Sequence, residues 1–213
     1  MKIGEVFRRA EERPPAFTMR HVCADNFRRK PKGEVFITLR DGRTGEVQDE
    51  RHLDNIVTLD ASIQIARLLK NNVEPRSGIN ALAVGAGQVG WNLQSPPAAT
   101  NTQRSLWSEI ARKTFSNTQF INAGGLPVAI PTNVVDYTTT FAEAEAVGPL
   151  VEMGLLCTLS TNMSVRNPVL PPNGAYDSTV DLTNFDVQCN SLNFAVINKP
   201  ATSTLTIVWR LTT

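Results

Sequence analysis

The chain has 213 residues and a net charge of +1, so its overall charge gives no reason to expect a nucleic-acid or membrane partner. A hydrophobic content of 41% suffices for one large β domain or for a domain with an arm. The absence of an 18-residue apolar run argues against a membrane span, and the charged first residues lack the apolar stretch of a secretory signal. Cys23, Cys157 and Cys189 are too widely spaced for a disulfide framework or a zinc site, so we expect reduced thiols.

The first quarter of the chain is predicted to be a charged N-terminal arm, residues 1–53. Residues 1–54 hold 12 of the 21 Lys and Arg residues and 10 of the 20 acidic residues. Phe7, Phe17 and Phe27 are the candidate anchors through which the arm would order on a neighbouring subunit. The alternative is a solvated tail. Acidic residues dilute the basic cluster Arg28–Lys32, so no nucleic acid is expected as a partner.

A β-hairpin is predicted within this arm at residues 34–50, because apolar and polar residues alternate on both sides of Asp41-Gly42. Residues 54–58 then form a short extended entry to a helix at 59–71. Thr58 or Asp60 can cap that helix. Its apolar residues recur at helical spacing and predict one face packed against a sheet: Ala61, Ile65, Leu68 and Leu69.

The stretch Ala81–Lys113 begins as a buried strand and then breaks at Gly85 and Gly87, which indicates a bulge or a close backbone approach. With Gly90, these glycines match the G-x-G-x-x-G spacing of a dinucleotide loop. The following residues, with Pro96 and Pro97 among them, cannot continue as the helix that such a loop requires, which argues against nucleotide binding. The loop at 88–102 is therefore a candidate contact surface.

Strands dominate the rest of the chain. They are predicted at 113–121, 133–141, 151–158, 190–198 and 203–211, with a long polar loop at 160–186. In the last strand, Leu205, Ile207, Trp209 and Leu211 face one way. Strands with long connections and almost no helix predict a mainly β fold, an antiparallel β-sandwich with one packed helix, over residues 54–213. Residues 114–213 carry only three basic residues, as expected for a surface partly covered by neighbours.

No residue pattern for catalysis, cofactor binding or metal binding is found. His21 and Cys23 offer two ligands, and no further cluster completes the site. Glu143, Glu145 and Glu152 are a possible carboxylate group, for which a solvated loop is the favoured interpretation. Among the tryptophans Trp91, Trp107 and Trp209, we predict Trp209 in the core and Trp91 exposed, as a candidate interface residue. The chain is not expected to be an enzyme.

The order of segments from about Asp54 to Thr213 resembles that of structural proteins of tailed bacteriophages, of the tail-fibre or collar type. The likeness is carried by the helix at 59–69 and by short motifs that follow it: A-V-G-x-G at 83–87, P-A-A-T-x-T at 97–102, R-K at 112–113, E-M-G-L-L at 152–156, and N-K-P and L-T-I-V-W-R-L-T at 198–200 and 205–212. Two loops, at 88–94 and 160–186, are longer than the resemblance leads one to expect.

The resemblance implies a virion protein, assembled in the host cytoplasm, with no enzyme activity and no cofactor. The expected function is that of a tail, neck or collar, or baseplate subunit that docks fibres or bridges neighbouring subunits. The alternatives are a capsid-surface decoration (cement) protein and a host-receptor or carbohydrate-binding module. The expected partners are copies of the same chain and other virion proteins, with no membrane, nucleic acid or small-molecule substrate.

Overall fold

A computed structural model of the chain describes residues 31–70, 78–160, 163, 169–172 and 176–213. The predicted anchors Phe7, Phe17 and Phe27 lie outside the described residues. Within the described residues, ten strands form one antiparallel sheet in the order β4-β3-β8-β9-β2-β1-β10-β7-β5-β6. Their bounds, with those of the helix α2 and the short 3-10 helix η1, are β1 Lys32–Asp41, β2 Val47–Val57, α2 Leu59–Lys70, β3 Ala81–Gly85, β4 Glu109–Thr114, β5 Asn117–Ile121, β6 Pro127–Val128, β7 Val134–Phe141, β8 Gly148–Cys157, η1 Leu182–Asn184, β9 Val187–Lys199 and β10 Ser203–Thr212.

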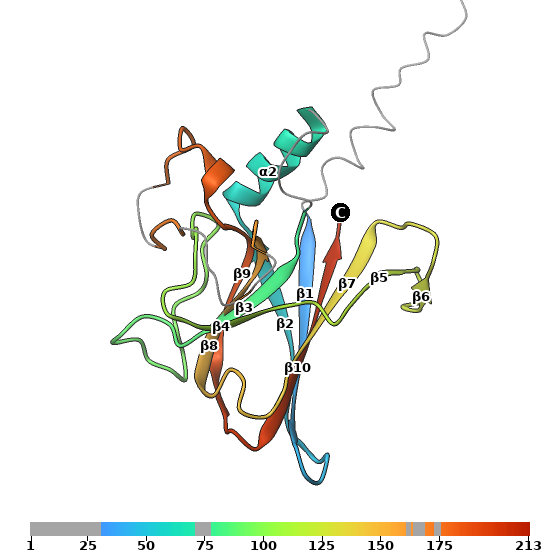
Figure 1. The fold of residues 1–213 in the computed structure, drawn as a ribbon, viewed down its shortest axis with the longest axis vertical. Coiled ribbons are helices and arrows are strands. Elements are labelled where there is room, and N and C mark those ends of the chain that lie inside the picture. The colour runs from blue at the N-terminus through green and yellow to red at the C-terminus, as the bar shows by residue number, and fades with distance from the viewer. Residues whose placement is uncertain (1–30, 71–77, 161–162, 164–168, 173–175) are drawn as a thin grey trace, which may run out of the picture. The chain divides into compact units, whose positions relative to one another are not determined.

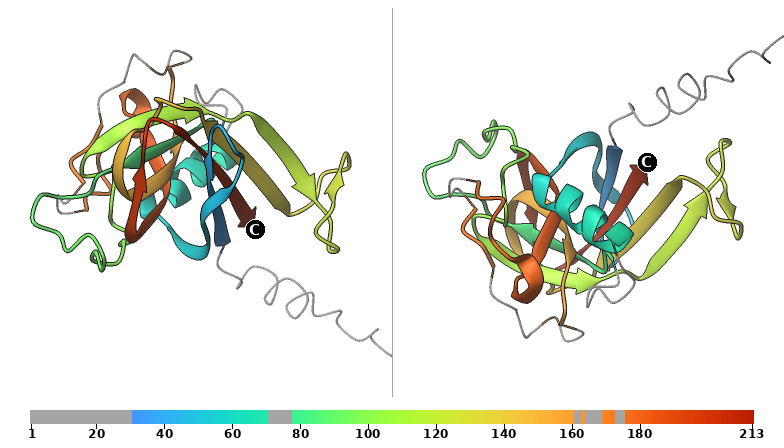
Figure 2. Two further views of the ribbon diagram at one scale, coloured as in Figure 1. Left: turned by 90° about the horizontal axis from the view of Figure 1, so that it is seen from below. Right: turned by 90° about the horizontal axis from the view of Figure 1, so that it is seen from above.

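The sheet folds on itself at β2. Most of β2 pairs with β1, whereas its last residues, Ile56 and Val57, pair with Ser191 and Asn190 of β9. On the other side, the chain passes from β4 in one layer to β5 in the other (Figures 1 and 2). The predicted mainly β fold, an antiparallel β-sandwich with one packed helix, is therefore confirmed.

Alternating residues of the facing strands fill the core between the two layers. In β1 and β10 every second residue is buried, as the sequence pattern predicts for strands with one face toward the core. Trp209 and Ile207 of β10 are fully buried against residues of β3, β8 and β9. The predicted core position of Trp209 is thus confirmed.

The compact unit begins at Pro31, not at residue 54 as the charge distribution predicts. The hairpin predicted at 34–50 exists as β1 and β2, but it belongs to the sheet. Strand β1 pairs over its whole length with β10, from Lys32–Thr212 to Asp41–Ser203. In β2, Glu50 and Asp54 lie at exposed positions and Asp49 and Arg51 at half-buried ones, so these charges belong to the sheet and not to an arm.

Strands β3 and β8 are buried on both faces. One face contributes Leu82 and Val84 to the core, and the other packs Ala81 and Ala83 against Leu106 of the following loop. Segments that the sequence predicts as loops therefore form a third layer over the sheet, together with α2.

Helix α2 is confirmed, but its predicted buried face is partly wrong. Thr58 caps the helix, because its Oγ1 accepts a hydrogen bond from the Ala61 amide at 3.2 Å. Only the first two turns pack closely, through Asp60, Ala61 and Gln64. The predicted apolar stripe is largely solvent-exposed, with Ile65 at 47%, Leu68 at 44% and Leu69 at 84% of their surface.

Candidate functional site

The corner after β3 is built around the buried carboxylate of Glu152 in β8. Its Oε1 accepts hydrogen bonds from the amides of Gly87 at 3.1 Å and Ser108 at 2.8 Å, and its Oε2 accepts one from Trp107 at 2.9 Å. Burial raises the pKa of Glu152, and these three N–H donors oppose that shift. The favoured interpretation of Glu152 as part of a solvated carboxylate group is therefore wrong, since this side chain holds both ends of the loop.

The two glycines of this corner serve backbone geometry, as the sequence predicts. A Cβ atom on Gly85 would lie 2.5 Å from Glu152 Oε1 and from the Ser108 carbonyl. Gly87 has a φ of +74°, and a Cβ there would lie 2.6 Å from the Trp91 ring. The predicted bulge appears as a register shift between Val84 and Gly85. Residues 86–108, all described, form turns and extended backbone without the helix that a dinucleotide loop needs.

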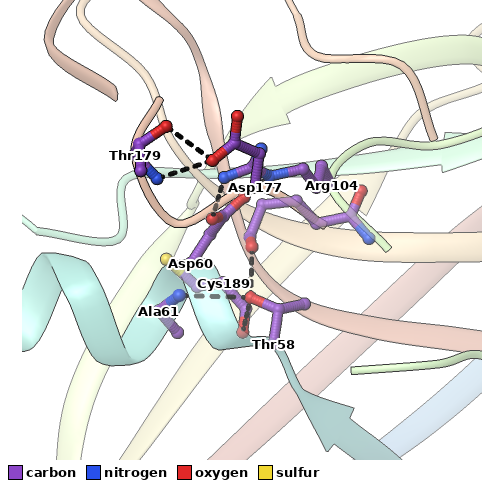
Figure 3. Close-up of polar contacts among 8 residues, drawn as sticks. Thr58, Asp60, Ala61, Arg104, Asp177, Thr179 and Cys189 are labelled. Atoms are coloured by element: carbon purple, nitrogen blue, oxygen red, sulfur yellow. Dashed lines mark hydrogen bonds and ion pairs between the residues drawn. The ribbon is translucent and has the colours of Figure 1, made fainter. Parts of the chain in front are cut away.

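A buried ion pair fixes the far end of the loop to the start of α2. Arg104 donates from Nε and Nη2 to the two carboxylate oxygens of Asp60, at 2.9 and 2.8 Å (Figure 3). Both side chains are almost fully buried. Asp60 lies in the first helical turn, where the helix dipole favours a negative charge. The guanidinium also stacks over the ring of Tyr176, at 4.7 Å from its centroid.

Two lysines from the motifs that carry the resemblance hold the connector between β7 and β8. Lys113 Nζ lies 2.6 Å from Glu145 Oε2, and Lys199 Nζ donates to the Ala142 carbonyl at 3.0 Å. The connector contains left-handed backbone at Ala144 and Ala146. These contacts compensate the strain of that backbone, so the motif lysines have a structural role.

We call residues 86–108, which Glu152 and the Arg104–Asp60 ion pair hold in place, the pinned loop. Its surface holds a shallow pocket that contains the candidate Trp91. Its ring meets Trp107 edge-on at 5.8 Å, and its Nε1 donates to Gln88 Oε1 at 3.2 Å. The pocket has a volume of about 330 Å³, and Gln103 and Asn193 also line it. The Asn193 amide donates to the Pro97 carbonyl, whereas its Oδ1 is buried without a partner among the described residues.

A second hollow is an apolar groove beside α2, with a volume of about 250 Å³. We call it the α2 groove and define it by the side chains that supply its walls: Val57, Ile65, Leu68, Ile79, Val135 and Leu211. Cys157 and Cys189 also line it as thiols, with their sulfurs 3.2 Å apart. Sequence periodicity identifies the helix residues of this groove but predicts them buried against the sheet.

Within the described residues, no cluster of three or more His, Cys, Asp or Glu side chains could hold a metal ion. The pair His21 and Cys23 lies outside them. Among the helices of the described part, none is long and apolar enough to span a membrane. A scan against protein-family models found no match to this chain, and a search of curated proteins also found none.

Proposed function

We propose that this chain is a structural subunit of a bacteriophage virion, in a tail, neck or collar, or baseplate position, that bridges neighbouring subunits. The observation that carries the proposal is the exposure of large apolar side chains on three separate elements. They are Leu68 and Leu69 on α2, Val89 on the pinned loop, and Leu126 and Ile130 at the β5–β6 hairpin. Apolar residues displayed on several elements favour contacts with several neighbours.

The pinned loop at residues 86–108 supports the proposed bridging function. An interface forms with a smaller loss of entropy when its elements are ordered beforehand. The Glu152 hydrogen bonds and the Arg104–Asp60 ion pair order the 86–108 loop in this way. The resemblance of residues 54–213 to phage tail-fibre and collar proteins points to the same class of function. A capsid-surface decoration protein would use the same surfaces.

The β5–β6 hairpin supplies a test. It extends from one end of the sheet (Figure 1), and Leu126 and Ile130 expose 64% and 77% of their surface. We expect the double variant Leu126→Ser, Ile130→Ser to self-associate at least tenfold more weakly, because burying one leucine is worth roughly 1.5–3 kcal/mol. Sedimentation velocity over a concentration series measures this. The matched control Thr118→Ser, an exposed residue of the same hairpin, should leave association unchanged. Equal association of the double variant and the wild type would exclude the hairpin from the interface.

A second candidate function is favoured by the Trp91 pocket. Two indole rings surrounded by uncharged amides and hydroxyls offer the stacking surface and the hydrogen bonds that suit a neutral saccharide. In this case a glycan array should give a signal that Trp91→Ala abolishes and Val89→Ala, in the same loop, preserves. An array without signal for the wild type would count against the carbohydrate-binding module.

A further inference from the structure

The α2 groove combines an apolar wall with unpaired buried amides. Gln64 exposes only 2% of its surface, and neither its Nε2 nor its Oε1 has a hydrogen-bond partner among the described residues. Asn190 Nδ2 on β9 is also buried and unpaired there. Both residues line the groove. An unpaired buried amide costs stability, which a ligand carrying both a donor and an acceptor would restore. A peptide backbone has this chemistry.

The apolar part of the groove suits an aromatic side chain. A dry cavity of roughly 150 Å³ lined by aliphatic residues is large enough to bind benzene. The α2 groove has about 250 Å³, and its walls are mostly aliphatic. Burial raises the pKa of the Tyr137 hydroxyl, as expected for a phenol that lines an apolar site. The groove therefore fits a peptide with a phenylalanine.

The sequence before the described region supplies such a peptide. Pro31, the first described residue, itself lines the groove. Among the thirty residues before it, the longest run without a charge is Pro14-Pro15-Ala16-Phe17-Thr18-Met19. Proline pairs favour an extended backbone, which lowers the entropy lost when a peptide binds. Phe7 is less suitable, because Glu5, Arg8 and Arg9 surround it.

Chain length allows a neighbouring copy as the source. Phe17 stands fourteen residues before Pro31, and that length of extended chain spans about 48 Å at roughly 3.4 Å per residue. A domain of residues 31–213 has a radius of gyration of about 16 Å, hence a width of about 40 Å. Phe17 can thus reach the groove of an adjacent copy. Phe27, only four residues before Pro31, has a reach of about 14 Å.

We propose that the α2 groove binds the Pro14–Met19 segment of a second copy, with Phe17 in the apolar part and its backbone paired to Gln64 and Asn190. This inference rests on the proposed assembly function and names its partner. Each copy then offers one arm segment and one groove. Such head-to-tail contacts close into a ring or continue as a helical array.

Two variants of the full chain test the contact from its two sides. Phe17→Ala removes the anchor, and Leu68→Glu places a charge at the groove wall. Each should weaken self-association by about 30-fold or more, the loss typical of a central interface residue, as measured by sedimentation velocity. The matched controls are Phe27→Ala on the arm and Ala66→Glu, at an exposed position of the same helix outside the groove lining. Both should associate like the wild type. Because Leu68 is half-exposed, thermal unfolding should be unchanged in all four.

Mixing the two variants separates exchange between copies from docking within one chain. The Leu68→Glu copy keeps an intact arm, and the Phe17→Ala copy keeps an intact groove. An equimolar mixture should therefore form heterodimers, whereas each variant by itself should associate only weakly. A mixture without heterodimers would overturn the proposed exchange. Undiminished association of both single variants would overturn the groove contact and leave other assembly surfaces in place, whereas a wild-type chain that stays monomeric at every concentration would contradict the proposed assembly function as well.

Discussion

Replacing Glu152 by alanine is expected to lower the free energy of unfolding by about 3–5 kcal/mol. The substitution leaves the buried amide of Gly87 and the part-buried amides of Trp107 and Ser108 without their acceptor. Each unpaired buried donor costs roughly 1–3 kcal/mol, and the three costs add incompletely because the corner relaxes. Urea denaturation measures the loss as a lower midpoint at unchanged slope.

Glu143→Ala is the matched control, since this carboxylate is exposed on the connector before β8. It should change stability by no more than about 0.5 kcal/mol. The stability of Glu152→Gln should lie between those of Glu152→Ala and Glu143→Ala. Its amide nitrogen would face the Trp107 N–H, while its oxygen would still accept from Gly87 and Ser108. If Glu152→Ala proves as stable as Glu143→Ala, the carboxylate does not hold the corner.

Replacing Arg104 by methionine is expected to cost about 3–5 kcal/mol, the loss typical of a buried charge that is left without its partner. Methionine keeps most of the length of the side chain, whereas Asp60 remains buried to 99% at the start of α2. The loop and the helix should separate locally. Hydrogen exchange should therefore quicken at the Leu59 amide, which donates to the Asn101 carbonyl across the same junction.

The double variant Asp60→Leu, Arg104→Met distinguishes loss of pairing from loss of packing. Replacing both charges by apolar groups is often neutral, so it should recover most of the stability that the single variant loses. The control Arg43→Met, at the exposed turn of the first hairpin, should have no measurable effect. A double variant as unstable as the single one would show that pairing with Asp60 is not the main contribution of Arg104.

The strands could be predicted from sequence because side chains alternate between the two faces of a strand. An alternation of apolar and polar residues therefore indicates which face is buried. This pattern is clear in β10, where Leu205, Ile207 and Trp209 all enter the core. It failed to separate β4 from β5, since the strand predicted at 113–121 runs through Phe115 and Ser116, where β4 has ended and β5 has not begun. The two-residue strand β6 carries too few residues for any pattern.

The candidate site could be predicted only in part. The position of Trp91 in a loop and the geometric role of Gly85 and Gly87 follow from local sequence, although Trp91 is half-buried and not exposed as predicted. The partners of Glu152 do not, because they lie 44 to 65 positions away along the chain. The α2 groove was also missed. Periodicity indicates that Ile65 and Leu68 share a helix face, and only the tertiary structure shows that the helix packs through its first turns.

The residues that carry the phage resemblance mostly have structural roles in the described domain. Glu152, Lys113 and Lys199 hold loops, and Gly154 leaves room for the Asn190 carbonyl, which a Cβ would approach to 2.8 Å. In the described domain these residues hold loops and strands in place. The resemblance thus concerns the framework, while the exposed apolar elements and the α2 groove are the surfaces on which the assembly proposal depends.

Quantitative mass spectrometry of purified phage particles tests the central proposal most directly. A virion structural subunit should be present in several copies per particle, at a constant ratio to the major capsid protein across preparations. The same ratio should persist after a high-salt wash, because apolar contacts are insensitive to charge screening. A chain that is abundant in the infected-cell lysate but absent from the washed particles would contradict the proposal.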